Sequence, residues 1–234
     1  MRVAVVVMET SHHRDTEGRR HLEQLAETLT EAGHDVTVFC TQWWDGSGSQ
    51  FEPDDVRYRG VTASATEAVF CTRLPALLAT YRPDVVHAYP APPSVLRAAK
   101  AGAKLARAPL VVECFDDYEK PVLERASKTA DQLVVPSKLL QTRLWEAGAT
   151  SDLTTVIPES IDVDLVHDVE PAQAVDVVYA HPLDETANIE SLFLGLAELR
   201  QRRWSATVIG DGPERERYEQ QATDLRIDDR VSFA

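Results

Sequence analysis

The chain has 234 residues and a formal net charge of -14, because 38 Asp and Glu outnumber 24 Lys and Arg. This length is enough for one or two domains with a full hydrophobic core. The acidity argues against nucleic acid as a partner, since duplex binding depends on Lys and Arg that neutralise phosphates.

Only five of the basic residues are Lys. An acidic, Arg-rich chain indicates a protein kept soluble at high salt, so we expect a halophilic, haloarchaeal-type source; the alternative is an ordinary acidic cytosolic protein. Cys40, Cys71 and Cys114 lie far apart without CxxC spacing, so neither a disulfide framework nor a metal site is expected. No run reaches the roughly 20 apolar residues of a transmembrane helix, and we expect a cytoplasmic protein.

The N-terminal residues predict a βαβ unit. Residues 2–8 form a continuous apolar run, as in a parallel strand that is buried on both faces. Residues 22–32 place Leu and Ala on one face of a helix that ends at Gly33, and residues 36–40 form the second strand. A crossover of this kind is almost always right-handed.

The same alternation continues along the chain. Further strands are predicted at residues 56–61, 84–87, 109–114, 132–135 and 155–157, and helices at 73–81, 93–106, 118–130 and 137–147. An alternating series of this length predicts an α/β fold with a doubly wound parallel sheet.

The segment from Thr155 to Val166 separates two units. It contains a short apolar strand, Pro158, which cannot continue a strand ladder, and an acidic connector. We therefore expect an N-terminal Rossmann-like domain over residues 1–168 and a second one over residues 169–234, with the functional site in the crevice between them.

The second unit predicts three strands and two helices. The strands fall at residues 175–180, 206–209 and 231–234, and the helices at 188–200 and from 214 onward. Such a unit would leave a sheet edge and apolar surface uncovered, so we expect an incomplete domain and a protein that continues beyond Ala234.

Six segments carry a resemblance to a known family. They are, in chain order, GRRHLEQLAETLTEAGHDVTVF, RPDVVHAYP, ADQLVVPS, VIPESIDVDLV, PLDETANIESLFLGLAEL and VIGDGPERERYEQQATDLRIDDRVSFA. Their order resembles that of the GT-B glycosyltransferases of family 4, over nearly the whole chain. The resemblance implies an N-terminal domain that holds the acceptor, a C-terminal domain that holds a nucleotide sugar, and transfer with retention of anomeric configuration.

The loop after the first strand holds four candidates. Gly18 precedes a helix, where backbone amides can face a phosphate. The family usually has two adjacent glycines here, whereas this chain has Gly18 followed by Arg19, whose charge could approach the donor's diphosphate. His12 and His13 are acceptor-side candidates, with solvated loop histidines as the alternative.

Two later strands end in further candidates. His87 matches the first His of the family's VVHxH pattern, with Tyr89 in place of the second. The resemblance makes His87 a catalytic candidate at the crevice rim and Tyr89 an acceptor-side candidate; a structural histidine is the equal alternative. Asp116 and Asp117 are also catalytic candidates, since a carboxylate there could bind or deprotonate an acceptor hydroxyl. Capping of the next helix by Asp117 competes with that role.

The second unit supplies a donor-side turn. It consists of Gly210, Asp211, Gly212 and Pro213. Its glycines let a backbone approach a flat ligand closely, and the resemblance places it beside the nucleotide base; a plain tight turn is the alternative. Relatives hold the donor's diphosphate with an Arg and a Lys nearby, but Pro182 and Ala187 stand at those positions here. The family's paired glutamates would lie beyond residue 234.

One predicted helix carries a basic stripe made of Arg97, Lys100, Lys104 and Arg107. It could rest on the inner face of an anionic membrane beside a lipid-linked acceptor, or be a solvated helix face. Trp43 and Trp44 could form an acceptor platform or fold back on the domain.

The leading hypothesis is a glycosyltransferase of the hexosyltransferase type, which moves a sugar from a nucleotide-sugar donor to a glycan or lipid-linked acceptor. We expect no metal or other cofactor. The alternative is a non-catalytic relative, or a fragment of the enzyme, that binds a sugar or a partner protein, as Pro182 and Ala187 suggest. A stand-alone nucleotide-binding α/β protein is a weaker third hypothesis.

Overall fold

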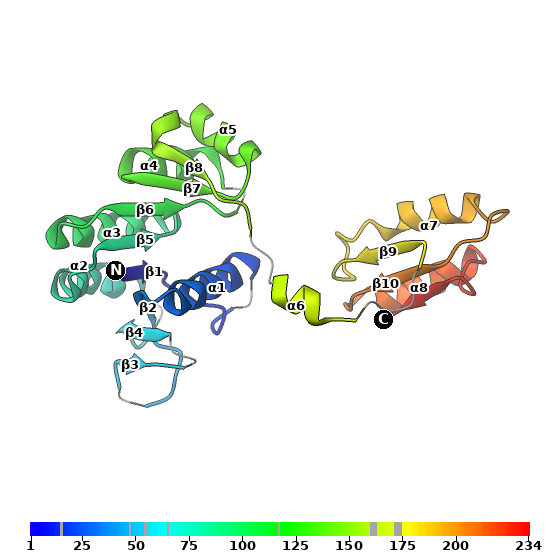
Figure 1. The fold of residues 1–234 in the computed structure, drawn as a ribbon, viewed down its shortest axis with the longest axis horizontal. Helices are drawn as coiled ribbons and strands as arrows, with labels where there is room; N and C mark the ends of the chain where they lie inside the picture. The colour runs from blue at the N-terminus through cyan, green and yellow to red at the C-terminus, as the bar shows by residue number, and fades with distance from the viewer. Residues whose placement is uncertain are drawn as a thin grey trace. The chain divides into compact units, whose positions relative to one another are not determined.

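The computed structural model describes residues 1–14, 16–46, 48–53, 56–64, 66–116, 118–159, 163–170 and 175–234. The chain forms two compact units, Met1–Ser160 and Ile161–Ala234 (Figure 1). The predicted boundary between residues 168 and 169 falls at the end of helix α6 (Val163–Asp168), inside the second unit. This helix forms within the segment that the sequence indicates as a connector. No helix in the described ranges is long and apolar enough to cross a membrane.

The first unit contains an eight-stranded sheet in the order β3-β4-β2-β1-β5-β6-β7-β8. Its strands are β1 (Arg2–Val6), β2 (Asp35–Thr41), β3 (Gln50–Phe51), β4 (Arg57–Thr62), β5 (Val85–Ala88), β6 (Leu110–Glu113), β7 (Gln132–Val135) and β8 (Thr154–Val156). All neighbouring strands run parallel except β3, which is antiparallel to β4. The chain adds strands on one side of β1 and then on the other, which confirms the predicted doubly wound fold.

Five helices pack on this sheet. They are α1 (Glu17–Glu31), α2 (Glu67–Tyr81), α3 (Pro93–Ala106), α4 (Lys120–Thr129) and α5 (Lys138–Glu146). Val3 and Val5 pack with the buried residues of α1, whereas Ala4 and Val6 pack with those of the other four helices. Both faces of β1 are therefore buried, as the continuous apolar run indicates.

Helix α2 is longer than the predicted helix at residues 73–81, because it begins at Glu67. Pro75 lies inside it, where proline removes a backbone hydrogen bond. Phe70, Leu74 and Leu78 are fully buried on one face. Tertiary packing along this face therefore holds a helix that local propensity would shorten.

The core of the first unit contains a cluster of three ionisable residues from separate elements: His21 of α1, His87 of β5 and Glu113 of β6. Glu113 Oε1 lies 2.9 Å from His21 Nε2, and Glu113 Oε2 lies 3.2 Å from His87 Nε2. The second contact is an ion pair without the directionality of a hydrogen bond, and His87 Nδ1 has no partner in the described residues. His87 and Glu113 are only 7% and 6% exposed.

The cluster keeps Glu113 ionised. Burial by itself would raise the pKa of Glu113, but the hydrogen bond with His21 and the nearby His87 ring outweigh it and lower the pKa from 4.5 to about 2. The hydrogen bond to Glu113 raises the pKa of His21 above 6.5, against the opposing effect of burial. A buried carboxylate with imidazole partners therefore ties one helix to two strands.

The second unit contains a parallel sheet in the order β11-β10-β9, made of β9 (Val177–Ala180), β10 (Ala206–Ile209) and β11 (Val231–Phe233). Helices α7 (Ile189–Glu198) and α8 (Arg215–Asp224) pack on it. The core includes Phe193 of α7, Val208 of β10 and Tyr218 of α8. The predicted order of strands and helices in this unit is confirmed.

The turn at residues 210–213 packs against the chain's own backbone. A Cβ at Gly210 would lie 2.1 Å from the carbonyl oxygen of His181, and one at Gly212 would lie 2.4 Å from that of Leu183. Gly210 also has a φ of +149°. The sequence predicts that the backbone of this turn approaches a ligand closely, but in the structure it approaches the segment after β9. This contact explains why both positions are glycine.

We predict that Gly210→Ala destabilises the second unit by about 2 kcal/mol or more, because backbone must shift to accept the methyl group. The matched control is Gly195→Ala in α7, where an added Cβ meets nothing within 4 Å. That change should stabilise the helix by about 0.5–1 kcal/mol. Calorimetric unfolding of both variants measures the difference, and equal stabilities would contradict the packing described here.

The cluster predicts a stability maximum at mildly acidic pH. The contribution of Glu113 to the free energy of unfolding is complete above pH 4.5 and is lost as the pH falls toward its folded pKa of about 2. The contribution of His21 is complete below 6.5 and is lost as pH rises through its raised pKa.

Glu113→Gln should weaken the fall in stability at both low and high pH. It should also reduce the free energy of unfolding by about 1–3 kcal/mol near pH 5.5, because the histidines lose their carboxylate partner. Denaturant unfolding across this pH range measures the effect. Glu146→Gln, on the exposed surface of α5, is the control for the loss of one charge. A profile for Glu113→Gln that is parallel to that of the wild type would show that the cluster does not control pH stability.

Candidate functional site

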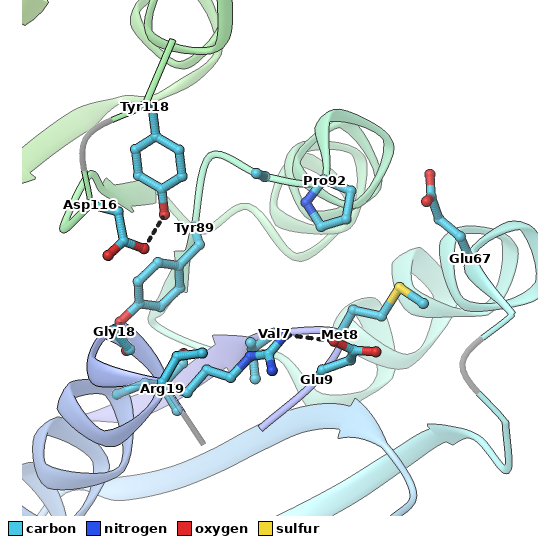
Figure 2. Close-up of a pocket in the computed structure, with 13 residues that line it drawn as sticks. Val7, Met8, Glu9, Gly18, Arg19, Glu67, Tyr89, Pro92, Asp116 and Tyr118 are labelled. Carbon is cyan, nitrogen blue, oxygen red and sulfur yellow. Dashed lines mark hydrogen bonds and ion pairs between the residues drawn. The ribbon is translucent and has the colours of Figure 1, made fainter. Parts of the chain in front are cut away.

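A cavity of about 420 Å³ opens in the first unit where the direction of strand addition reverses (Figure 2). It lies at the carboxyl ends of β1, β5 and β6 and at the start of α1, which is where open α/β sheets bind ligands. Its lining includes Val7, Met8, Glu9, Thr16, Gly18, Arg19, Leu22, Glu67, Tyr89, Ala91, Pro92, Asp116 and Tyr118.

Two tyrosines and one aspartate form a polar wall of the cavity. The Tyr118 hydroxyl donates to Asp116 Oδ2 over 3.4 Å, and the Tyr89 hydroxyl donates to the carbonyl oxygen of Gly18 over 3.4 Å. Burial raises the pKa of both tyrosines, and nearby carboxylates raise it further. Both hydroxyls therefore stay protonated near neutral pH and keep their donor role. Figure 2 shows Tyr118 pointing toward Asp116.

Gly18 and Arg19 line the cavity, but their surroundings differ from those expected for a phosphate site. A Cβ at Gly18 would lie 3.1 Å from Asp116 Oδ2, so the glycine makes room for a carboxylate beside the helix start. Arg19 Nη2 lies 2.5 Å from Glu9 Oε2, and Arg19 Nη1 donates to the carbonyl oxygen of Arg14. The charge of Arg19 is therefore already compensated within the chain.

His12 and His13 are absent from the lining of this cavity. The His12 ring stacks on Trp43 with centroids 3.6 Å apart, and its Nδ1 lies 3.1 Å from Glu23 Oε1. His13 Nδ1 accepts a hydrogen bond from the Thr10 amide, and burial lowers the pKa of His13.

The tryptophans fold back on the first unit. Trp43 contacts Trp44, Phe51 and Tyr58 edge-to-face, and Trp44 stacks on Phe51 with centroids 5.7 Å apart. Of the two alternatives that the sequence leaves open, the structure supports packing against the domain.

The expectation that His87 points to a crevice rim is wrong. Val85, His87 and Tyr89 share the sheet face that α1 covers, so the His87 side chain enters the cluster with Glu113 and is absent from the cavity lining. Tyr89, just past the end of β5, does reach the cavity. Asp116 also reaches it, whereas Asp117 lies outside the described residues.

The donor-side candidates lie in the second unit. Asp211 and Pro213 are exposed, and Asp211 Oδ1 accepts from the Gly212 amide over 2.9 Å. Ala187 is only 5% exposed and belongs to the apolar core, so this position is closed to a charged side chain, whereas Pro182 is exposed. The positions where relatives carry cations therefore provide none here.

Sequence reasoning missed several residues of these sites. Glu9 directly follows the first strand, and Glu67 opens α2; both carboxylates line the cavity. Arg215 follows the 210–213 turn and donates to the carbonyl oxygen of Gly210 over 3.3 Å. The position of Glu9 after the first strand, and those of Glu67 and Arg215 at the starts of helices, were the available signal. The described ranges contain no group of three or more His, Cys, Asp or Glu that could hold a metal ion.

Several solved structures have the same fold, and each of the three described here aligns with the whole of this chain. A glycosyltransferase from Rickettsia africae superposes with a TM-score of 0.75 at 14% identity, and this chain spans 67% of its length. The lipopolysaccharide outer core galactosyltransferase WaaB gives 0.72 at 18% identity, with 67% of its length spanned. The HepE protein of Anabaena, solved in complex with UDP, gives 0.71 at 18% identity, with 68% spanned.

No curated protein matches the chain in sequence. Residues 18–165, more than half of the chain, match the family described as Glycosyltransferase Family 4. The matched range begins at Gly18, which lines the cavity, and includes every described element of the first unit from α2 onward. The chain therefore belongs to glycosyltransferase family 4 and has the GT-B type of α/β fold.

Proposed function

We propose that the protein transfers a sugar, with retention of anomeric configuration, from a nucleotide-sugar donor to a hydroxyl of a glycan or lipid-linked acceptor. The observation that carries the proposal is the cavity at the strand-order reversal, with Asp116 fixed beside two protonated tyrosines. Family membership supports a nucleotide sugar as substrate, as do the structures of HepE with UDP and with UDP-glucose.

The cavity suits the acceptor better than the donor. Glu9, Glu67 and Asp116 bring three carboxylates to it, and its one guanidinium, that of Arg19, is paired. Carboxylates accept hydrogen bonds from sugar hydroxyls and repel phosphates. Asp116 is the residue we assign to orient the attacking hydroxyl and accept its proton, with the Tyr118 hydroxyl holding the carboxylate in place.

The donor would contact the second unit. The 210–213 turn lies between β10 and α8, and Arg215 carries a guanidinium beside it. In this proposal Arg215, whose Nε lies 3.0 Å from Glu219 Oε1, supplies positive charge for the diphosphate that Pro182 and Ala187 do not. Cationic groups next to the diphosphate stabilise the negative charge that develops as the sugar departs.

The second candidate function is binding of a sugar or a partner protein without transfer. The buried Ala187 favours it, because the position of the family's Lys is closed. In this case the first cavity would still bind a hydroxyl-rich ligand, but no nucleotide would be released.

We also propose that the protein works in the cytoplasm under high salt and touches the inner membrane face through α3. Lys100 pairs with Asp131 at 2.7 Å, which reduces the charge of the stripe, but Arg97, Lys104 and Arg107 are exposed. Two exposed cations on α3 and a third at its C-cap support a weak contact with anionic lipid.

The test of transfer uses the full gene product with UDP-, GDP- and ADP-sugars. We expect one nucleotide sugar to raise the melting temperature and, with acceptor, to release its nucleoside diphosphate. Asp116→Asn should lower the transfer rate about 100-fold and leave the donor-induced shift in place. Asp228→Asn, on the surface of the second unit, is the matched control and should keep full activity.

The outcomes separate the two candidate functions. If none of the nucleotide sugars changes the melting temperature or releases a nucleoside diphosphate, the transferase proposal is excluded. Binding of a sugar without nucleotide release would support the non-catalytic relative. Full activity of Asp116→Asn would remove Asp116 from the acceptor site while leaving the transferase itself standing.

A further inference from the structure

We propose that a second cavity in the first unit, between β4 and α2, binds a phosphate-type oxyanion. This cavity also has a volume of about 420 Å³ and shares no lining residue with the first. Its polar lining comes from Ser49 in the loop before β3, Arg59 on β4, and Thr72 and Arg73 on α2.

The two arginines reach the cavity from separate elements, and each makes a contact with an uncharged group. The half-buried Arg59 has its guanidinium carbon 5.8 Å from the centroid of the Phe39 ring. Arg73 Nη1 donates to the carbonyl oxygen of Val61 over 3.4 Å, which leaves the other N–H groups of its guanidinium. Within the described part of the chain, neither arginine forms an ion pair with a carboxylate.

The charge of this cavity is opposite to that of the first. Among the described residues its lining contains two guanidiniums and no carboxylate, whereas that of the first contains three carboxylates and a paired guanidinium. On a chain with a net charge of -14, an anion is repelled from most of the surface, so a concave site with positive lining collects it selectively.

The chemistry of the lining selects phosphate. Guanidinium groups match the oxygens of a phosphate in a bidentate manner, and two of them from different directions suit a doubly charged tetrahedral group. The Ser49 hydroxyl adds a further donor at the rim. The ligand class is therefore a phosphate monoester dianion, either on a small molecule or on a lipid headgroup. The site does not depend on the transferase proposal.

The first experiment titrates the full protein with inorganic phosphate at low ionic strength and about pH 8, where phosphate is largely dianionic. We expect saturable heat of binding in the wild type and at least a tenfold weaker affinity in the Arg59→Gln, Arg73→Gln double variant. Arg203→Gln removes one exposed guanidinium from the loop before β10, outside the cavity, and should bind as the wild type does. Arg73→Gln alone keeps the test valid if loss of Arg59 disturbs folding, because Arg73 is exposed.

A second arm distinguishes the source of the phosphate with vesicles of phosphatidylcholine that contain phosphatidic acid. Vesicle binding that inorganic phosphate competes away would assign a lipid headgroup, and phosphate binding without vesicle binding would assign a soluble phosphate ester. Equal phosphate affinity in the wild type and the double variant, or no phosphate binding by the wild type, would overturn the proposal.

Discussion

The position of β1 in the centre of the first sheet is the constraint on which the rest of the structure depends. β1 pairs in parallel with both β2 and β5, so the chain has to add strands first on one side of it and later on the other. The connections after β1 and β5 consequently diverge, and the space between them becomes the first cavity. The buried apolar run of residues 3–6 makes this arrangement stable on both faces.

The electrostatics of the first unit follow from the same arrangement. His21, His87 and Glu113 come together from α1, β5 and β6, and the Glu113 carboxylate contacts both imidazoles inside the unit. The carboxylates of the cavity lie beyond the strand ends, where water and ligands can reach them. The unit thus separates a buried charge network, which stabilises the fold, from an accessible acidic site, which is available to bind hydroxyl groups.

Apart from β3 and α6, the order of strands and helices could be predicted from the sequence, because strand runs and helix periodicity are local patterns. The start of α2 could not, since packing of Phe70 overrides the effect of Pro75. Tyr89 and Asp116 both line the cavity because they follow strands whose ends converge in a parallel sheet, and their roles stay predictions. His87 was misplaced because a strand position alone does not show that Glu113, on the neighbouring strand, supplies a buried partner.

The glycine turn at residues 210–213 joins two loops of the second unit. Gly210 and Gly212 lie directly on the carbonyl groups of His181 and Leu183, and the Glu214 amide donates to the Leu183 carbonyl. The loops that follow β9 and β10 are therefore joined as one rigid body. A molecule that displaces one of these loops must also displace the other. An insertion in one loop would therefore require a compensating change in the other.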